Sequence, residues 1–513
     1  MAQARRSREP ELRHDGDRPN PGRGNGSPPE GGRPEGTPDG EVPTRPVPHL
    51  APAAARTATV RLFGSHDFFR LWLAQVVSAL GDWIGFLALL AIAERIGGAG
   101  AIGVVMTARI LPGFFLAPLA GVLLDRWNRK RVMVGCDVGR AVVLLALPLV
   151  DSIFQLVVLS FLLEVLTVMW SPAKEAEVPN MVPAGHLATA NSLSMVAAYG
   201  SIPVAAGLFA GLAKVADVLS RQESLAFLDE ASLAVYFDVV TFLLSAVLIS
   251  TLRFGDGARA TTAPGTSTSG TSTSRRADRG GVDLRGTLRD FKEGWQFVAS
   301  NRTVAAVMVG MGAGLIGGGM LVPLGPLFTE QVLGGGTAGF GLVVFALGMG
   351  VAVGVVAISV LNARFDKPRT FTTALVAAGV ALLLGASMST LIPALALVAI
   401  LGAGAGCAYV LGYTILQEGV SDDLRGRTFT ALYTVVRLCL LIAFAVGPFL
   451  AGALGRLSDR LSEGEVSLGG LTISTPGVRL TLWLAAVIIV VAGVLAGRVL
   501  REGESRAPEE VTA

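Results

Sequence analysis

Long apolar runs separated by short polar loops dominate the chain from about residue 68 to residue 500. A membrane-spanning helix needs roughly 20 apolar residues, and the pattern predicts about twelve such helices, divided by a polar stretch in mid-chain. The predicted spans are Leu71–Ala93, Ile102–Leu124, Val132–Val150, Ile153–Trp170, Ser192–Leu212 and Ala234–Leu252, then Val304–Leu327, Phe340–Val360, Thr370–Met388, Ile392–Leu416, Thr428–Leu450 and Leu480–Val499.

The composition fits this pattern. The 513 residues are 51% hydrophobic and 16% charged, whereas soluble domains carry about 25% charged residues. The sequence therefore predicts an all-α integral membrane protein with two pseudo-symmetric six-helix bundles. A net charge of +3 gives no reason to expect nucleic-acid binding.

The domain boundaries follow from changes in composition. Residues 1–67 form a predicted disordered tail, since the Pro- and Gly-rich sequence has few apolar residues to bury. The first bundle is expected over 68–253 and the second over 301–500, followed by a tail over 501–513. The linker, 254–300, ends in a helical pattern (284–300) that predicts an amphipathic surface helix or a simple extension of the seventh span.

Positive charge predicts the orientation. Lys and Arg cluster after the even-numbered spans, as in Arg129–Arg131, and cytoplasmic loops retain such residues. Both termini are therefore expected in the cytoplasm. The Arg-rich, Lys-poor usage favours a bacterial source, and hence a multi-pass protein of the bacterial inner membrane.

The loop between the second and third spans carries the most specific motif. Gly121-Val-Leu-Leu-Asp125-Arg126-Trp-Asn128-Arg129-Lys130-Arg131 resembles the signature that members of the major facilitator superfamily carry at this position. Asn128 stands where the family usually has Gly, and Asn also tolerates left-handed backbone angles. The resemblance implies the major facilitator fold and secondary transport.

Other segments resemble the drug-exporter-like branch, which includes enterobactin and macrolide exporters. They are Leu80-Gly81-Asp82-Trp83, Trp170-Ser-Pro172-Ala173 with Val182-Pro183, Ala190-Asn191-Ser192-Leu193 and Leu424-Arg425-Gly426-Arg427. This resemblance, together with Asp82 inside the first span, favours proton-coupled efflux of a small amphipathic compound, and we expect the protein to be a monomer. The alternatives are an importer or lipid flippase on the same fold, or a membrane scaffold or sensor that does not transport.

The loop motif also implies a gate. In the family, the carboxylate at Asp125 faces the start of the eleventh helix, and the gating set expected here is Gly121, Asp125, Arg126, Arg129, Lys130, Asp137 and Arg140. Arg129 is expected to pair with an acid such as Asp137, and Arg140 to belong to the same cytoplasmic network. The alternative is that these cations only set the topology.

Ionisable residues inside the spans are the candidates for proton or substrate binding, because charge in the bilayer is costly unless paired or hydrated. They are Asp82, Arg109, Glu164 and Arg437. Arg109 and Arg140 are expected partners for Asp82 and Glu164. Fixed structural ion pairs are the competing interpretation. Asp238 is expected near the outer end of the sixth span.

Small residues and prolines mark possible hinges at Gly310, Gly314 and Gly318 in the seventh span, Pro203 in the fifth, and Gly447 and Pro448 in the eleventh. Such residues permit either bending or close helix packing. Gly350 and Gly354 in the eighth span are expected to serve packing alone.

The sequence does not indicate an enzymatic activity. The sequence offers no catalytic triad, no Walker lysine and no metal-ligand spacing, so we expect a non-enzyme without cofactor or metal. Active transport would then draw on an ion gradient. One proton moving through about 100 mV supplies ~2.3 kcal/mol.

Overall fold

The computed structural model describes residues 58–124, 127–222, 229–252, 301–361, 366–420, 422–462, 465–468 and 471–506. The predicted disordered tail (apart from 58–67), the linker with its surface helix, and the end of the C-terminal tail lie outside the described residues. Asp125 and Arg126 of the loop motif lie outside them as well.

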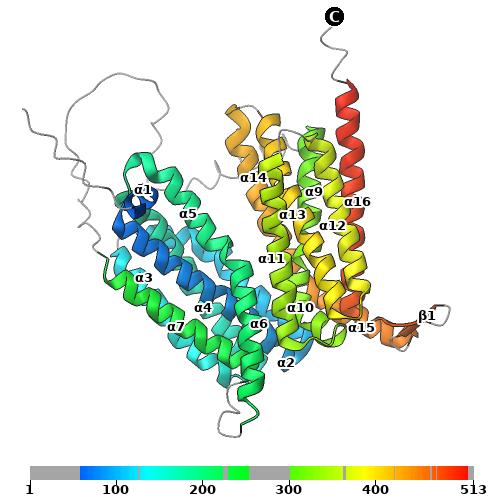
Figure 1. The fold of residues 1–513 in the computed structure, drawn as a ribbon, viewed down its shortest axis with the longest axis horizontal. Coiled ribbons are helices and arrows are strands. Elements are labelled where there is room, and N and C mark those ends of the chain that lie inside the picture. Colours follow the sequence, from blue (N-terminus) through cyan, green and yellow to red (C-terminus); the bar gives the residue numbers. More distant parts are fainter. Residues whose placement is uncertain are drawn as a thin grey trace, which may run out of the picture. The chain divides into compact units, whose positions relative to one another are not determined.

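Helices account for nearly all of the described chain (Figure 1). In the first half they are α1 (Ala58–Phe63), α2 (His66–Leu124), α3 (Arg129–Ala146), α4 (Ile153–Met181), α5 (Leu187–Tyr199), α6 (Ser201–Leu219) and α7 (Glu230–Ser250), with short 3-10 turns η1 (Leu147–Leu149) and η2 (Ala184–His186). In the second half they are α9 (Arg302–Gly319), α10 (Leu321–Gln331), α11 (Gly336–Leu361), α12 (Lys367–Ser387), α13 (Leu391–Gly419), α14 (Asp422–Leu441), the π-helix η5 (Ile442–Val446), α15 (Gly447–Ser462) and α16 (Gly477–Arg506). A hairpin that the sequence did not predict, β1 (Glu465–Leu468) with β2 (Leu471–Ser474), separates α15 from α16.

The first two predicted spans are joined in one long element, α2, which consists of two helices that meet at a kink at a glycine pair. Gly97 and Gly98 have non-helical angles, and Gly98 takes a φ of 56°, which glycine adopts without a steric penalty. The apolar part of α2, His66–Gly113, is 48 residues long, or about 70 Å at 1.5 Å per residue. It crosses a hydrocarbon core of about 30 Å twice. Eleven membrane-length helices in the described residues thus provide about twelve crossings, which confirms the predicted fold class.

Three spans contain breaks near the predicted bending residues. Gly200 separates α5 from α6, Met320 separates α9 from α10 just after Gly319, and the π-helix η5 precedes Gly447. Proline and π-helical segments are ordinary causes of helix bending. The breaks lie where the sequence placed Pro203, Gly318 and Gly447.

Two local expectations were wrong. The fourth span was expected to end at Trp170, but α4 continues to Met181 through Pro172 and Pro179, because burial of Ala173 and Val178 on this extension outweighs the low helix propensity of the prolines. Asn128 was expected to take a left-handed turn, but its backbone is extended (φ −70°, ψ 109°). Its side chain caps α3 by accepting a hydrogen bond from the Arg131 amide at 3.1 Å.

The start of α7 is fixed against α2. Asp229 caps α7 by accepting a hydrogen bond from the Ser232 amide at 2.7 Å, and it pairs with Arg95 of α2. Partial burial acts to raise the pKa of Asp229, but the hydrogen bonds from Ser232 and Arg95 outweigh it and hold the pKa below its ordinary value. This anchor positions the rest of α7, including Asp238, along α2.

Successive crossings alternate in direction, so the connections fall on two sides. We call them the Asn128 side, which holds the α2–α3 connection, and the Gly98 side, which holds the break in α2. The two halves of the chain meet toward the Gly98 side, where α6 packs on α11 and α15 packs on α2. Gly341 lies against Ala206 and Ala210, and the rings of Phe209 and Phe340 are 6.1 Å apart.

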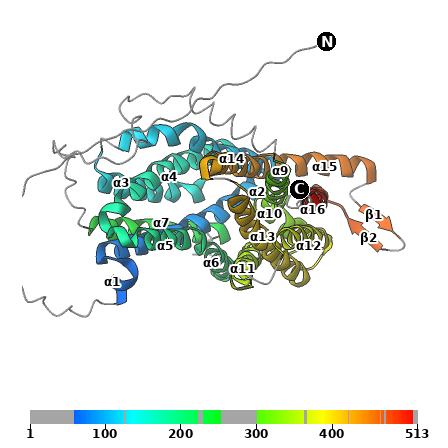
Figure 2. The ribbon, with the colours of Figure 1, turned by 90° about the horizontal axis from the view of Figure 1, so that it is seen from above.

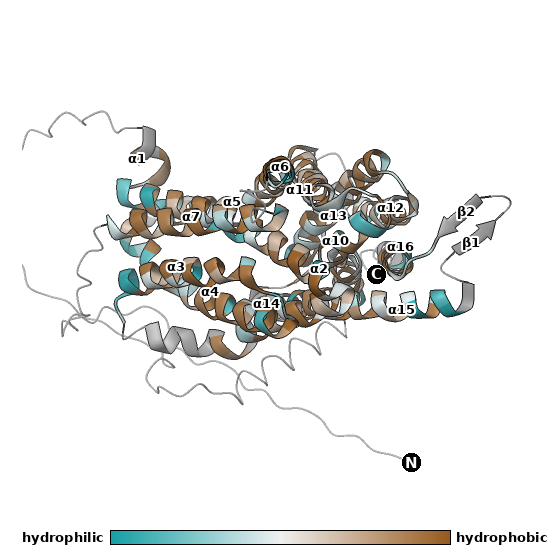
Figure 3. Cartoon of the chain, turned by 90° about the horizontal axis from the view of Figure 1, so that it is seen from below, coloured by the Kyte–Doolittle hydropathy of each residue, from teal (hydrophilic) through white to brown (hydrophobic). Residues whose placement is uncertain are grey.

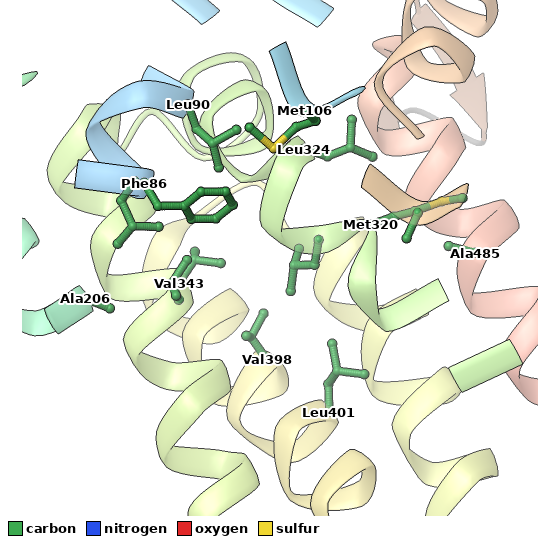
Figure 4. Packing of buried hydrophobic residues seen from close by; sticks show 14 of the residues in the cluster. Phe86, Leu90, Met106, Ala206, Met320, Leu324, Val343, Val398, Leu401 and Ala485 are labelled. Atoms are coloured by element: carbon green, nitrogen blue, oxygen red, sulfur yellow. The ribbon is translucent and has the colours of Figure 1, made fainter. Parts of the chain in front are cut away.

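A single hydrophobic cluster connects both halves. Figure 4 shows Phe86, Leu90 and Met106 of α2 beside Leu324 of α10. In the second half, α11, α13, α12 and α16 form consecutive packed pairs, and Figure 2 shows α11, α13 and α12 as neighbours. The core therefore includes residues from both sets of six spans.

The outer surface is apolar along the helices. Leu149, Phe154 and Ile392 are among the large hydrophobic side chains left exposed, at 80%, 76% and 81% of their surface. Figure 3 shows apolar residues over most of the helix lengths. Such an extensive apolar exterior is expected where the surrounding solvent is lipid.

Candidate functional site

A cavity of about 790 Å³ lies toward the Asn128 side. Its lining comes from α2, α3, α4 and α5, with Phe444 of η5 added from the second half. Aromatic and charged side chains share the walls, and the charged ones are Asp82, Arg109, Arg140, Lys174 and Glu175. A cavity of this size, with an apolar body and a few polar groups, suits a small organic ligand.

A second cavity of about 450 Å³ adjoins the first. Both are lined by Phe86, Arg109 and Phe444, and the second also has Glu164 of α4 and Arg437 of α14 in its walls. The structure therefore brings Arg437, a candidate from the second half, to the same region as Arg109 and Glu164.

Arg140 of α3 is the centre of a buried ion cluster. Its guanidinium lies 3.2 Å from Asp82 and also pairs with Asp137, one turn earlier on α3. Asp137 additionally accepts a hydrogen bond from the Ser245 hydroxyl of α7 at 2.8 Å. The Arg140 side chain lies over the ring of Phe242 at 4.1 Å. Three helices thus hold this guanidinium in place.

This cluster corrects the gate assignment of two residues. Asp137 and Arg140 were expected in a network with Arg129 at the cytoplasmic end. Both are instead fully buried beside Asp82, and Arg129 pairs with Glu177 of α4 at 3.2 Å. The loop sequence could not reveal Glu177, because it lies in α4 beyond the proline where the fourth span was expected to end.

Asp238 of α7 is a further member of the region. It was expected near the outer end of its span, but it is buried and lies against Gly81 and Gly85 of α2. The Thr241 hydroxyl donates to it at 3.1 Å, and among the described residues no basic side chain forms an ion pair with it. The spacing Gly81-x-x-x-Gly85 was the sequence signal that α7 approaches α2 closely here.

Arg109 and Glu164 form the second pair of the region. The Arg109 Nε atom lies 3.8 Å from a Glu164 oxygen, and the Arg109 guanidinium lies 5.3 Å from the Phe86 ring centroid. The expected pairing of Asp82 and Glu164 with Arg140 and Arg109 is therefore found in the structure. A fixed structural ion pair and an ion pair that breaks during transport would both have this geometry.

The charges of this region do not balance. Around Arg109 and Arg140 lie four carboxyl groups, which belong to Asp82, Asp137, Glu164 and Asp238. Arg437 and Lys174 line the same cavities, but among the described residues neither forms an ion pair with these four acids. Fully ionised, the set would carry two excess negative charges within the membrane-spanning region. Uncompensated buried charge is costly, so proton binding to this set is favoured over its full ionisation.

The other gating residues lie at the Asn128 side. Lys130 donates to the Leu252 carbonyl at 2.6 Å, which ties the start of α3 to the end of α7, and Arg129 also donates to the Ala176 carbonyl. Gly121 lies in the last turn of α2. Because Asp125 and Arg126 lie outside the described residues, the predicted contact with the eleventh span stays a prediction.

The hinge candidates have different surroundings. Gly310 and Gly314 lie against Leu375 of α12, whereas Gly318 has open space beside it. Pro203 lies against Gly348 of α11, and Gly447 lies against Met320 at the break between α9 and α10. Pro448 follows as the second residue of α15. Packing is thus evident at four of these positions, and hinge motion stays a prediction.

Comparison with known proteins identifies related chains. Residues 71–446, and in a second match residues 317–513, fit the sequence model of the Major Facilitator Superfamily. BacE of Bacillus amyloliquefaciens, which is named as a putative bacilysin exporter, is 25% identical over 74% of this chain and 86% of its own length. Macrolide efflux protein A of Streptococcus pyogenes is 27% identical over 23% of this chain, and the aligned part spans 31% of that protein.

Solved structures share the fold. A bacterial homologue of the human lysosomal transporter Spinster, in an inward-facing and unoccupied conformation, superposes with a TM-score of 0.61. The alignment covers 85% of this chain and 98% of that one at 15% identity, a level that supports similarity of fold alone.

Proposed function

Because the chain belongs to the Major Facilitator Superfamily, we propose that it exports a small amphipathic compound from a bacterial cell in exchange for protons. It is a multi-pass membrane transporter with relatives that are named as exporters. The proposal adds the direction, the coupling ion and the class of substrate. It also places the Asn128 side, with its Lys and Arg residues, in the cytoplasm.

The excess of carboxyl groups beside the cavity is the observation that supports proton coupling. Asp82 is the group we assign as the exchanging acid, because its side chain is 31% exposed in the cavity wall while Asp137 is fully enclosed. When Asp82 binds a proton, its ion pair with Arg140 is lost, and Arg140 keeps Asp137 as its partner. Lys174 and Glu175 of α4 also face the cavity and contribute to its field.

Alternating access supplies the transport step. The halves touch toward the Gly98 side, and the cavity lies toward the Asn128 side, so a compound enters from the latter. Rocking of the two six-helix sets would separate the Gly98-side contacts and open the cavity there. A substrate that displaces the proton from Asp82, and a proton that later displaces the substrate, together give antiport.

Replacing Asp82 with asparagine is expected to abolish proton-driven efflux, because the amide keeps the size of the carboxyl group but cannot exchange a proton. The measurement is the initial rate of efflux of rhodamine B, an amphipathic dye with a carboxyl group and a cationic ring system, from cells that lack their own pumps. In the unchanged protein, a protonophore should reduce the rate to background. In Asp82→Asn the rate should already be at background.

The matched control is Asp217→Asn, which changes an exposed acid of α6 that pairs only with Arg221 among the described residues. It should leave efflux unchanged. Rhodamine B efflux that is unaffected by both the protonophore and Asp82→Asn would show that proton coupling through Asp82 is wrong.

A further inference from the structure

Lys174 of α4 is a buried cation without an acid to balance it. Only 8% of the residue is exposed, and it lines the larger cavity. Among the described residues, no carboxylate lies within ion-pair distance of its ammonium group, although the adjacent Glu175 also faces the cavity. Burial of an unpaired ammonium ion is costly, and a ligand reaching it through the cavity would remove that cost.

The surroundings of Lys174 add to the positive character of this corner. Trp170, one turn earlier on α4, has the Lys174 ammonium 6.0 Å and the Arg140 guanidinium 5.5 Å from its ring centroid. The Trp170 indole nitrogen and the Arg140 Nε atom are both buried without a hydrogen-bond acceptor. The Trp170 ring therefore carries one enclosed donor without an acceptor, and the Arg140 guanidinium beside it carries another, while the Lys174 ammonium lies by the same ring.

Other tryptophans of the region do not share this property. The indole of Trp72 donates to the Leu193 carbonyl at 2.8 Å, and that of Trp83 donates to the Ala198 carbonyl at 3.2 Å. The missing acceptor at Trp170 is thus a local feature of the Lys174 corner. Because the Trp170 and Arg140 nitrogens are enclosed, the Lys174 ammonium is the group that a ligand meets first.

An acid on the same cavity wall can bind a cation, which complements the positive charge at Lys174. Asp82 is partly exposed there, whereas Glu177, on the same helix as Lys174, is occupied by Arg129. In an antiport cycle the substrate must displace a proton from Asp82, which a cationic group does and an anionic group opposes. The cavity therefore offers one site for an anion and another for a cation.

We propose that the Lys174–Trp170 corner binds an anionic oxygen group of the transported compound, while its ammonium group lies toward Asp82. This assignment rests on the proposed function and names the substrate class as an apolar zwitterion. Two sources share this chemistry, namely a short peptide with apolar side chains and an ethanolamine phospholipid. Lys174 and Asp82 contact the substrate, and Arg140 acts as a positioning residue.

Thermal unfolding of the purified full-length protein in a neutral detergent tests the assignment without any ion gradient. The probes are the dipeptide Phe-Phe, its C-terminal amide and its N-acetyl derivative, with lysophosphatidylethanolamine as the lipid probe. A ligand that binds the folded state raises the unfolding temperature with concentration. We expect Phe-Phe or the lipid probe to bind at least tenfold more tightly than the amide, and the N-acetyl dipeptide to bind more weakly than Phe-Phe.

Lys174→Gln should remove the preference for the free carboxylate, and Lys174→Arg should retain it. The matched control is Lys214→Gln, which changes an exposed lysine of α6. The unliganded unfolding temperatures show whether each variant is folded. Protection by Phe-Phe or by the lipid probe identifies the source of the zwitterion.

Equal binding of dipeptide and amide, binding unaffected by Lys174→Gln in a folded protein, or no protection by any probe at millimolar concentration would overturn the assignment. Because no gradient is present, this result is independent of proton coupling. A Lys174-dependent preference combined with efflux that ignores the proton gradient would leave the binding site in place and reject the antiport mechanism.

Discussion

Replacing Arg140 with methionine is expected to lower the free energy of unfolding by roughly 3–5 kcal/mol, the effect of removing one partner from a buried ion pair. Arg140 is 1% exposed and is the basic residue that pairs with both Asp82 and Asp137. Without it, Asp137 is left fully buried, with the Ser245 hydroxyl as its remaining hydrogen-bond donor among the described residues. Methionine keeps the unbranched apolar stem of the side chain, and the lost contacts of the guanidinium with the Phe242 and Trp170 rings add to the effect.

Thermal unfolding can be followed by the reaction of buried thiols with a fluorescent dye, since Cys136 and Cys439 are buried in the folded state. Adding Asp137→Asn to Arg140→Met should restore part of the stability, because it removes the uncompensated acid. The control Arg437→Met changes an exposed arginine in a span and should have little effect. A loss below about 1 kcal/mol in Arg140→Met would contradict the cluster as described.

Replacing Gly354 with alanine is the second change with a large expected effect. A Cβ atom at Gly354 of α11 would overlap the Ala403 carbonyl of α13, and one at Gly350 would overlap the Ala399 carbonyl. The contact is reciprocal, because Gly402 and Gly406 of α13 lie against the backbone of α11. The obstacle is backbone on both sides, so no side chain can rotate away. We expect a loss of roughly 1–3 kcal/mol or more from overpacking.

Gly211→Ala is the matched control, because no atom lies within 4 Å of the position that a Cβ would take there. Alanine is favoured over glycine in helix interiors by about 1 kcal/mol, so this variant should be as stable as the unchanged protein or slightly more so. Both unfolding temperatures are measured in the same detergent. If Gly354→Ala were equally well tolerated, the close contact of α11 and α13 would be refuted.

The fold was largely predictable, because the bilayer imposes a length and an apolar composition on each crossing. The pattern located the spans, and the packing assigned to Gly350 and Gly354 is confirmed. The positions of the helix ends were harder to predict from the sequence. The fourth span was expected to end at Trp170, yet α4 continues through Pro172 because burial of Ala173 and Val178 outweighs the hydrogen bond lost there.

The site was predictable in its members but not in its pairings. Asp82 and Arg140 were recognised from the cost of charge in the bilayer, and they do pair. Asp137 was assigned to the wrong network, because sequence gives neither the depth of a side chain nor the helix that faces it. The sequence did not single out Lys174, since its burial depends on the tertiary arrangement of α3, α4 and α5.

The central claim is that the two six-helix sets must separate on the Gly98 side during each transport cycle. A disulfide between Ala99→Cys in α2 and Gly452→Cys in α15 tests it, because a Cβ at Gly452 would lie 3.7 Å from the Ala99 Cβ, within the range for disulfides. The background carries serine at Cys136, Cys407 and Cys439. Oxidation should reduce rhodamine B efflux to background and a reductant should restore it, with each single-cysteine variant unaffected. Full efflux by the cross-linked protein would contradict the account.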